Sequence, residues 1–151
     1  MRLNLGCGKD VKKGYLNIDI RDLPGVIVAD VSDPIVMLRF FGAEEILAYD
    51  IIEHLPRQVA HDTLRLWYDM LANGGVLRIR CPDILHATSL RDIRGDEWLE
   101  QLLYGGQDYP ENQHLCGFTR GMMERLLEQV GFTSWRITNN NAGNMDVEAR
   151  K

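Results

Sequence analysis

Short apolar runs of strand length recur along the chain, separated by turn-forming and helical segments. These runs predict β-strands at residues 2–5, 15–20, 26–28, 45–49, 76–81, 132–137 and 145–149. Glycine or proline stands beside several of the runs, as expected where a chain turns. The pattern therefore predicts a protein built around one sheet.

Helical spacing of apolar side chains is clearest at residues 57–71. The Asn-Gly-Gly sequence at residues 73–75 is expected to end this helix by supplying left-handed backbone. A shorter helix is predicted at residues 34–41, because Asp33 is a suitable N-cap and Pro34 suits the first helical position.

The second half of the chain contains less regular patterns. Residues 83–104 are predicted to form one or two helices, and residues 105–117 a polar loop rich in turn formers. Thr119 is the expected N-cap of a helix that runs to Val130 and ends at Gly131.

Strands that alternate with helices or loops are typical of a parallel α/β sheet covered on both faces. One connection is unusual, because only ten residues separate Gly8 from Asp19. A crossover helix with its turns usually needs a dozen residues or more. The first helix is therefore expected to be shortened to a loop.

Composition narrows the class of protein. The 151 residues predict one domain, and the 17 basic residues are scattered at a net charge of −5, which argues against a broad nucleic-acid surface. Three cysteines without CxxC spacing argue against a disulfide framework or a structural zinc site and favour a cytoplasmic location. No signal-peptide or membrane-spanning segment is expected.

The turn after the first strand has the sequence Gly6-Cys7-Gly8, which brings bare backbone close to a ligand. A dinucleotide fingerprint needs a third glycine where this chain has Val11, and an acidic residue later than Asp19. No phosphate-binding P-loop sequence occurs. These exclusions leave a ligand that contains adenosine and no pyrophosphate, and S-adenosylmethionine is such a ligand.

Several segments resemble the class I S-adenosylmethionine-dependent methyltransferases, in the order and spacing of that family. They are LNLGCG at 3–8, YLNIDI at 15–20, AYDIIEHL at 48–55, LANGGVL at 71–77, and Phe118-Thr119 through Gly131-Phe132. The resemblance covers nearly the whole chain. It implies one methyltransferase domain over residues 1–151, with a Rossmann-like, mostly parallel seven-stranded sheet, helices on both faces, an antiparallel last strand and a shortened first helix.

The resemblance also implies cofactor-binding roles. Gly6, Cys7 and Gly8 would wrap the methionine part and the ribose of S-adenosylmethionine. Asp19 would hold the ribose hydroxyls, and Ile20 would lie against the adenine.

Later segments complete the implied site. Asp30 and Val31 would flank the adenine amino group, and Tyr49 and Asp50 would lie below the sulfonium. Asp30 has a structural alternative, since an aspartate at this point can simply open a turn. The Glu53-His54 pair would lie near the mouth where substrate approaches, although Glu53 can equally serve as a helix cap or pairing group.

Methyl transfer from a sulfonium needs mainly alignment, and a base only where the acceptor carries a proton. His54 and His114 are the candidate bases, with ordinary hydrogen-bonding roles as the alternative. A metal site at His114 and Cys116 lacks further nearby ligands in the sequence, so no metal is expected.

The expected function is methyl transfer to a small-molecule or glycan-type acceptor. Two alternatives remain: a binding protein with this fold and no turnover, and a protein or nucleic-acid methyltransferase. The sequence Asp50-Ile51-Ile52-Glu53 is not the Asn/Asp-Pro-Pro-Tyr type expected of the last class. No membrane partner is expected, and the thin cover near the shortened helix leaves a homodimer open.

Overall fold

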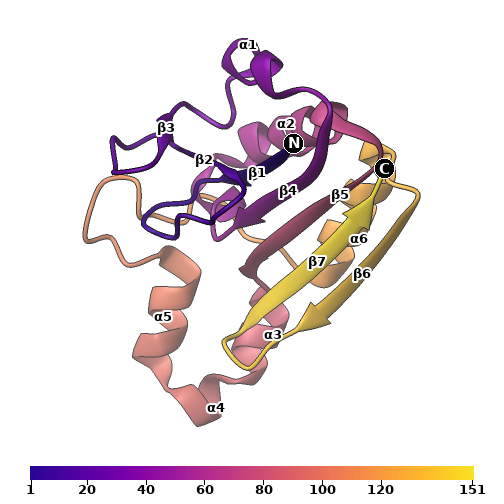
Figure 1. Cartoon of the computed structure of the whole chain (residues 1–151). Coiled ribbons are helices and arrows are strands. Elements are labelled where there is room, and N and C mark those ends of the chain that lie inside the picture. The colour runs from indigo at the N-terminus through magenta and orange to yellow at the C-terminus, as the bar shows by residue number, and fades with distance from the viewer.

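The computed structural model describes residues 1–151 and contains a seven-stranded sheet in the order β3-β2-β1-β4-β5-β7-β6 (Figure 1). All strands run parallel except β7, which is antiparallel to both β5 and β6. Their bounds are β1 Arg2–Leu5, β2 Leu16–Asp19, β3 Ile27–Val28, β4 Ala43–Tyr49, β5 Leu71–Pro82, β6 Ser134–Asn139 and β7 Asn144–Arg150. The predicted Rossmann-like sheet with an antiparallel last strand is confirmed.

The helices lie in the connections from β3 onwards. They are α1 Pro34–Met37, α2 Arg57–Met70, α3 Ile84–Ser89, α4 Arg91–Arg94, α5 Asp96–Tyr104 and α6 Arg120–Val130, with 3-10 turns η1 Leu38–Phe40 and η2 Ile52–His54. The connections from β1 to β2 and from β2 to β3 contain no helix. No helix combines the length and the apolar character that crossing a bilayer requires.

One face of the sheet carries the hydrophobic core. Strand alternation places Leu3, Ile46 and Leu77 on this face, where all three are fully buried. Figure 1 shows α2 and α6 together behind the sheet, and their apolar sides, including Trp67 and Leu127, complete the core. Burial of these apolar side chains is the main force that joins helices and sheet.

The opposite face is covered by charged side chains instead of helices. Arg78 on β5 forms salt bridges with Glu45 at 2.9 Å and with Glu148 at 2.5 Å. The hydroxyl of Tyr15 donates to Glu45 at 2.6 Å. Helices were expected on both faces of the sheet. In the structure, α2 and α6 cover one face, and the two helix-free connections leave the centre of the other face to this polar network.

Helix α2 ends at Met70, before the Asn-Gly-Gly sequence that was expected to stop it. Leu71 is already extended, because it pairs with Ala43 at the start of β4. Gly74, at φ +77°, then lies within a register shift of the β4–β5 pair. The prediction that the glycines end this helix is wrong, because the pairing of Leu71 with β4 ends it before the glycines are reached.

Helix α6 begins and ends as predicted. The Thr119 hydroxyl accepts a hydrogen bond from the Met122 amide, and Gly131 takes the left-handed conformation at φ 111°. Thr119→Ala removes the cap and is expected to lower the free energy of unfolding by about 1 kcal/mol. Urea denaturation measures this loss, and Thr119→Ser, which keeps the hydroxyl, should retain most of the stability. Equal stability of the alanine and serine variants would contradict the capping role.

Candidate active site

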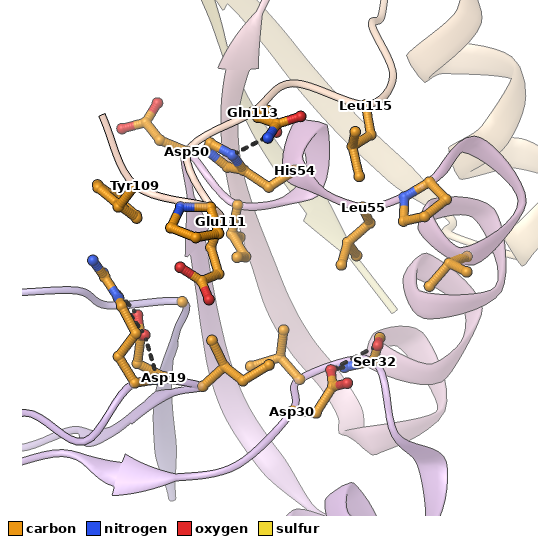
Figure 2. Close-up of a pocket in the computed structure, with 18 residues that line it drawn as sticks. Asp19, Asp30, Ser32, Asp50, His54, Leu55, Tyr109, Glu111, Gln113 and Leu115 are labelled. Atoms are coloured by element: carbon orange, nitrogen blue, oxygen red, sulfur yellow. Dashed lines mark hydrogen bonds and ion pairs between the residues drawn. The ribbon is translucent and has the colours of Figure 1, made fainter. Parts of the chain in front are cut away.

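A cavity of about 480 Å³ opens at the carboxyl edge of the parallel strands, where β1 is flanked by β2 and β4 (Figure 2). Ligands of open α/β sheets bind at such topological switch points. The cavity is lined by the ends of these strands, the segment after β3, the start of α2 and a loop after α5. The lining residues are Gly6, Asp19, Ile20, Arg21, Asp30, Val31, Ser32, Asp50, Ile51, His54, Leu55, Pro56, Val59, Tyr109, Pro110, Glu111, Gln113 and Leu115.

Asp19 ends β2 and faces this cavity, as predicted, with only 4% of its surface exposed. Its Oδ2 accepts the Gly8 amide at 2.7 Å, and its Oδ1 accepts the amide and Nε of Arg21, each at 3.0 Å. Burial alone would raise the pKa of Asp19, but these hydrogen bonds and the guanidinium charge together lower it. The carboxylate is therefore charged at neutral pH and held in a fixed orientation.

Arg21 connects Asp19 to the loop that covers the cavity. Its guanidinium lies over the ring of Tyr109, 4.9 Å from the ring centroid, while its Nε pairs with Asp19. Tyr109 belongs to the polar loop predicted at residues 105–117, which has no helix or strand. The cation–π contact thus brings this loop against the ends of the strands.

The two residues after β3 that were predicted to flank an adenine both line the cavity. Asp30 accepts the Ser32 amide at 2.8 Å and its hydroxyl at 2.6 Å, so its carboxylate also shapes the turn (Figure 2). Val31 is buried, and its carbonyl accepts the indole N–H of Trp67 at 3.1 Å. Asp30 therefore both stabilises a turn, which was its structural alternative, and lines the cavity.

Tyr49 and Asp50 lie at the end of β4, but only Asp50 lines the cavity. Alternation along the strand turns the Tyr49 ring to the charged face of the sheet, under the guanidinium of Arg80 at 5.0 Å. The Tyr49 side chain therefore does not line this cavity, and the position below the sulfonium expected for this residue stays a prediction. Asp50 has positive φ, at 53°, and pairs with Arg80.

The glycine turn contributes backbone more than side chains. Gly6 lines the cavity, whereas Cys7 is buried beside it and Gly8 donates its amide to Asp19. Neither Cys7 nor Gly8 lines the cavity, and their cofactor contacts stay predictions. Burial raises the pKa of the Cys7 thiol, which agrees with a structural rather than a nucleophilic role.

The side chain of Ile51 leaves no room for a residue larger than glycine at position 6. Its φ is +60°, and a Cβ built there would lie 2.4 Å from Cγ1 and 2.7 Å from Cβ of Ile51. Gly6→Ala is therefore expected to lower the free energy of unfolding by roughly 2–3 kcal/mol, from left-handed strain and overpacking.

Urea denaturation of Gly6→Ala, Ile51→Ala and the double variant tests this reason. The cost of Gly6→Ala should shrink when Ile51 is already alanine, because Cγ1 and Cδ1 of Ile51 are removed and only the contact with its Cβ remains. An unchanged cost in the double variant would show that Cγ1 and Cδ1 of Ile51 do not restrict this position.

The segment after β4 forms a cluster with the covering loop that the sequence spacing does not reveal. Glu53, His54 and His114 each offer one ligand atom, and these atoms all lie within 4.8 Å of one another. The two imidazole rings meet edge to face, with centroids 4.8 Å apart. The sequence pointed only to Cys116 as a partner for His114, because residues 60 positions apart meet here through the fold alone.

Burial governs the titration of this cluster. Glu53 is 2% exposed, so it lies beneath the surface and not at the mouth, where it was predicted; burial raises its pKa to about 8. Burial also lowers the pKa of His54 and of His114, against the raising effect of bonds to backbone carbonyls. All three groups therefore resist carrying charge in the absence of a ligand.

A second cavity, of about 310 Å³, adjoins the first, and Leu115 lines both. Residues from η2, the end of β5, the start of α3, α5 and the covering loop surround it, and most of their side chains are apolar. The lining residues are Glu53, Pro82, Ile84, Leu102, Leu103, Tyr104, His114, Leu115, Cys116 and Gly117. His54 thus faces the first cavity and His114 the second, so the predicted pair of bases spans the boundary between them.

Comparison with known proteins identifies the fold. No family model and no curated protein sequence matches the chain. Among solved structures, a SAM-dependent methyltransferase from Archaeoglobus fulgidus superposes with a TM-score of 0.69 at 14% identity, over 99% of this chain and 85% of that one. A SAM-dependent methyltransferase from Thermotoga maritima, described as a possible histamine N-methyltransferase, gives 0.65 at 13% identity over 99% and 81%.

A third similar structure, PigF with SAH, gives a TM-score of 0.63 at 15% identity, and the chain spans half of its length. SAH is S-adenosylhomocysteine, the product that remains when S-adenosylmethionine loses its methyl group. At these identities the likeness concerns the fold. The chain has the fold of class I S-adenosylmethionine-dependent methyltransferases.

Proposed function

We propose that the protein transfers a methyl group from S-adenosylmethionine to a small-molecule or glycan-type acceptor by in-line displacement. The observation that carries the proposal is the pair of adjoining cavities at the carboxyl edge of the sheet. One presents a buried, charged aspartate at the end of β2, and the other is largely apolar and reaches the Glu53, His54 and His114 cluster. A cofactor site and an acceptor site that share a wall are what group transfer requires.

The residues of the first cavity fit the cofactor. The Asp19 carboxylate can accept both ribose hydroxyls, although Arg21 must give up part of its bonding to Oδ1. Ile20, Val31 and Ile51 supply apolar wall for the flat adenine. The cavity volume of about 480 Å³ lies within the range of roughly 300–1,000 Å³ typical of small-molecule sites.

The sulfonium of the bound cofactor supplies an activated methyl group and a neutral thioether leaving group. The protein then has to align the acceptor with the methyl carbon, at about 3–3.5 Å, and exclude competing water. Apolar side chains that line the second cavity, such as Leu102 and Leu115, serve the second task.

The histidines are placed to accept a proton from a hydroxyl or amine acceptor. Nδ1 of His54 lies 3.0 Å from the Gln113 carbonyl, and Nδ1 of His114 lies 2.9 Å from the Leu102 carbonyl (Figure 2 shows the first pair). Because a carbonyl only accepts, each Nδ1 carries the hydrogen and each Nε2 keeps its lone pair. Both Nε2 atoms are therefore able to accept a proton.

The test is production of S-adenosylhomocysteine against a panel of hydroxyl, amine and carboxylate acceptors, including sugars. With a true acceptor, His54→Ala and His114→Ala should each lower turnover at least tenfold, whereas His61→Ala on α2, outside both cavities, should not. Undiminished turnover in both variants would remove them as proton acceptors.

The panel also separates the alternatives. Cofactor binding without turnover on any acceptor would favour a binding protein, and turnover on a protein or nucleic acid alone would overturn the proposed acceptor class.

A further inference from the structure

The three-residue cluster between the two cavities has the composition of a metal site. Glu53 and His54 come from the η2 turn after β4, and His114 comes from the loop after α5. Their ligand atoms lie within 4.8 Å of one another. One carboxylate and two imidazoles form a common donor set for first-row divalent cations such as Zn²⁺.

The two histidines are held as metal-ligating histidines usually are. Each Nδ1 is bonded to a backbone carbonyl, of Gln113 for His54 and of Leu102 for His114. Such an outer bond fixes the tautomer and leaves Nε2 as the ligand atom. The carbonyls belong to α5 and to the covering loop, so the fold itself orients both rings.

Glu53 lacks the partner that its burial demands. The residue is 2% exposed, and Oε2 is buried without a hydrogen-bond partner. It takes part in no salt bridge, and the nearby Asp50 carboxylate is already paired with Arg80. A buried carboxylate is tolerated when it is hydrogen-bonded, paired or bound to a metal. A carboxylate oxygen of Glu53 lies within 4.8 Å of a ring nitrogen of each histidine.

We propose that Glu53, His54 and His114 bind one divalent cation of the Zn²⁺, Mn²⁺ or Co²⁺ type. Bonds of about 2.0–2.2 Å place neighbouring ligand atoms roughly 3–3.6 Å apart, so atoms that lie 4.8 Å apart must approach by roughly 1–2 Å. Glu53 lies in a short turn and His114 in a loop, and we expect side-chain rotation there to close this distance. Three protein ligands leave coordination positions open, as in catalytic rather than structural sites.

This site deepens the proposed function, on which its role in catalysis rests. The open positions adjoin the second cavity, so an acceptor hydroxyl can bind there, and coordination lowers the pKa of that hydroxyl. The acceptor oxygen then releases its proton to solvent and forms a bond to the methyl carbon. The carbon–sulfur bond breaks, and its electron pair goes to sulfur. The favoured acceptor is therefore a hydroxyl compound and the product a methyl ether. When the cation is bound, the Nε2 atoms of His54 and His114 are ligands, and this role replaces the proton-accepting role proposed for them above.

The test is direct metal binding by the full chain without an affinity tag. After removal of metals with EDTA and of the EDTA by dialysis, calorimetric titration with ZnCl₂, MnCl₂ or CoCl₂ alone should show one site per chain. The absorption spectrum of bound Co²⁺ should report nitrogen and oxygen ligands. Glu53→Gln and His114→Ala should each weaken the binding at least tenfold, whereas His61→Ala should leave it unchanged.

Two further measurements distinguish a failure of the metal site from a failure of the proposed function. Circular dichroism shows that the variants are folded, and S-adenosylhomocysteine binding by the same samples reports the cofactor site independently. Absence of saturable binding of all three cations to the wild-type chain, or unchanged binding in folded Glu53→Gln and His114→Ala, would overturn the metal site. Loss of the metal site alone would leave cofactor binding intact, whereas failure of the proposed function would appear as absent S-adenosylhomocysteine binding.

Discussion

Replacing Asp19 with alanine will weaken the binding of S-adenosylhomocysteine by at least about 100-fold. A hydrogen bond to a charged group contributes about 1.5–3 kcal/mol, and Asp19 can accept from both ribose hydroxyls. Loss of two such bonds corresponds to about 3 kcal/mol or more, which is two orders of magnitude or more in affinity. The carboxylate is charged and is held in a fixed orientation by Gly8 and Arg21.

Thermal unfolding measures the effect. Saturation at 100 times the dissociation constant adds about 2.7 kcal/mol to stability, which raises the melting temperature of a chain of this size by roughly 5–10 °C. The wild-type chain should show this shift and Asp19→Ala should not. Asp19→Asn retains an acceptor for the Gly8 amide and controls for folding, and Asp92→Asn, on exposed α4, controls for charge. A full shift in Asp19→Ala would disprove the ribose role.

Replacing Trp67 with alanine will lower the free energy of unfolding by about 3–5 kcal/mol. The ring is fully buried on α2, in the core between this helix and the sheet. Its indole N–H also donates to the Val31 carbonyl at 3.1 Å, so the same side chain fixes the segment after β3 that lines the first cavity.

Urea denaturation of three proteins separates the two contributions of Trp67. Trp67→Phe keeps most of the apolar area but leaves the Val31 carbonyl without its donor, for a loss of about 1–3 kcal/mol. Trp67→Ala should lose clearly more than Trp67→Phe. A loss below 1 kcal/mol in the alanine variant would show that the ring is not a core element.

The sequence predicts the scaffold well where local chemistry decides it. The strands, the caps at Asp33 and Thr119, and the left-handed end at Gly131 depend on residues close in sequence, and the structure has all of them. Asp19 was predictable too, because a carboxylate at the end of the second strand necessarily lies at the carboxyl edge of a parallel sheet.

Other features depend on contacts between distant segments. The end of α2 at Met70 is set by pairing of Leu71 with Ala43, which overrides the glycines that follow. The side of the sheet that Tyr49 faces follows from strand alternation, and counting residues from Ile46 would have revealed it.

The cluster of Glu53, His54 and His114 at the cavity boundary could not be predicted from the sequence. His54 and His114 are 60 positions apart, and they meet because the covering loop returns to η2, the turn after β4, where Leu115 and Cys116 donate their amides to the Glu53 carbonyl. That return path has no local signature. The same holds for Arg21 and Tyr109, whose contact joins the end of β2 to this loop.

Calorimetric titration of the wild-type chain with S-adenosylhomocysteine, and in parallel with NADH, tests whether the protein binds the methyl-donor cofactor. We expect saturable binding of one S-adenosylhomocysteine per chain and no binding of NADH. No heat of binding with S-adenosylhomocysteine at millimolar concentration, or comparable binding of NADH, would contradict it.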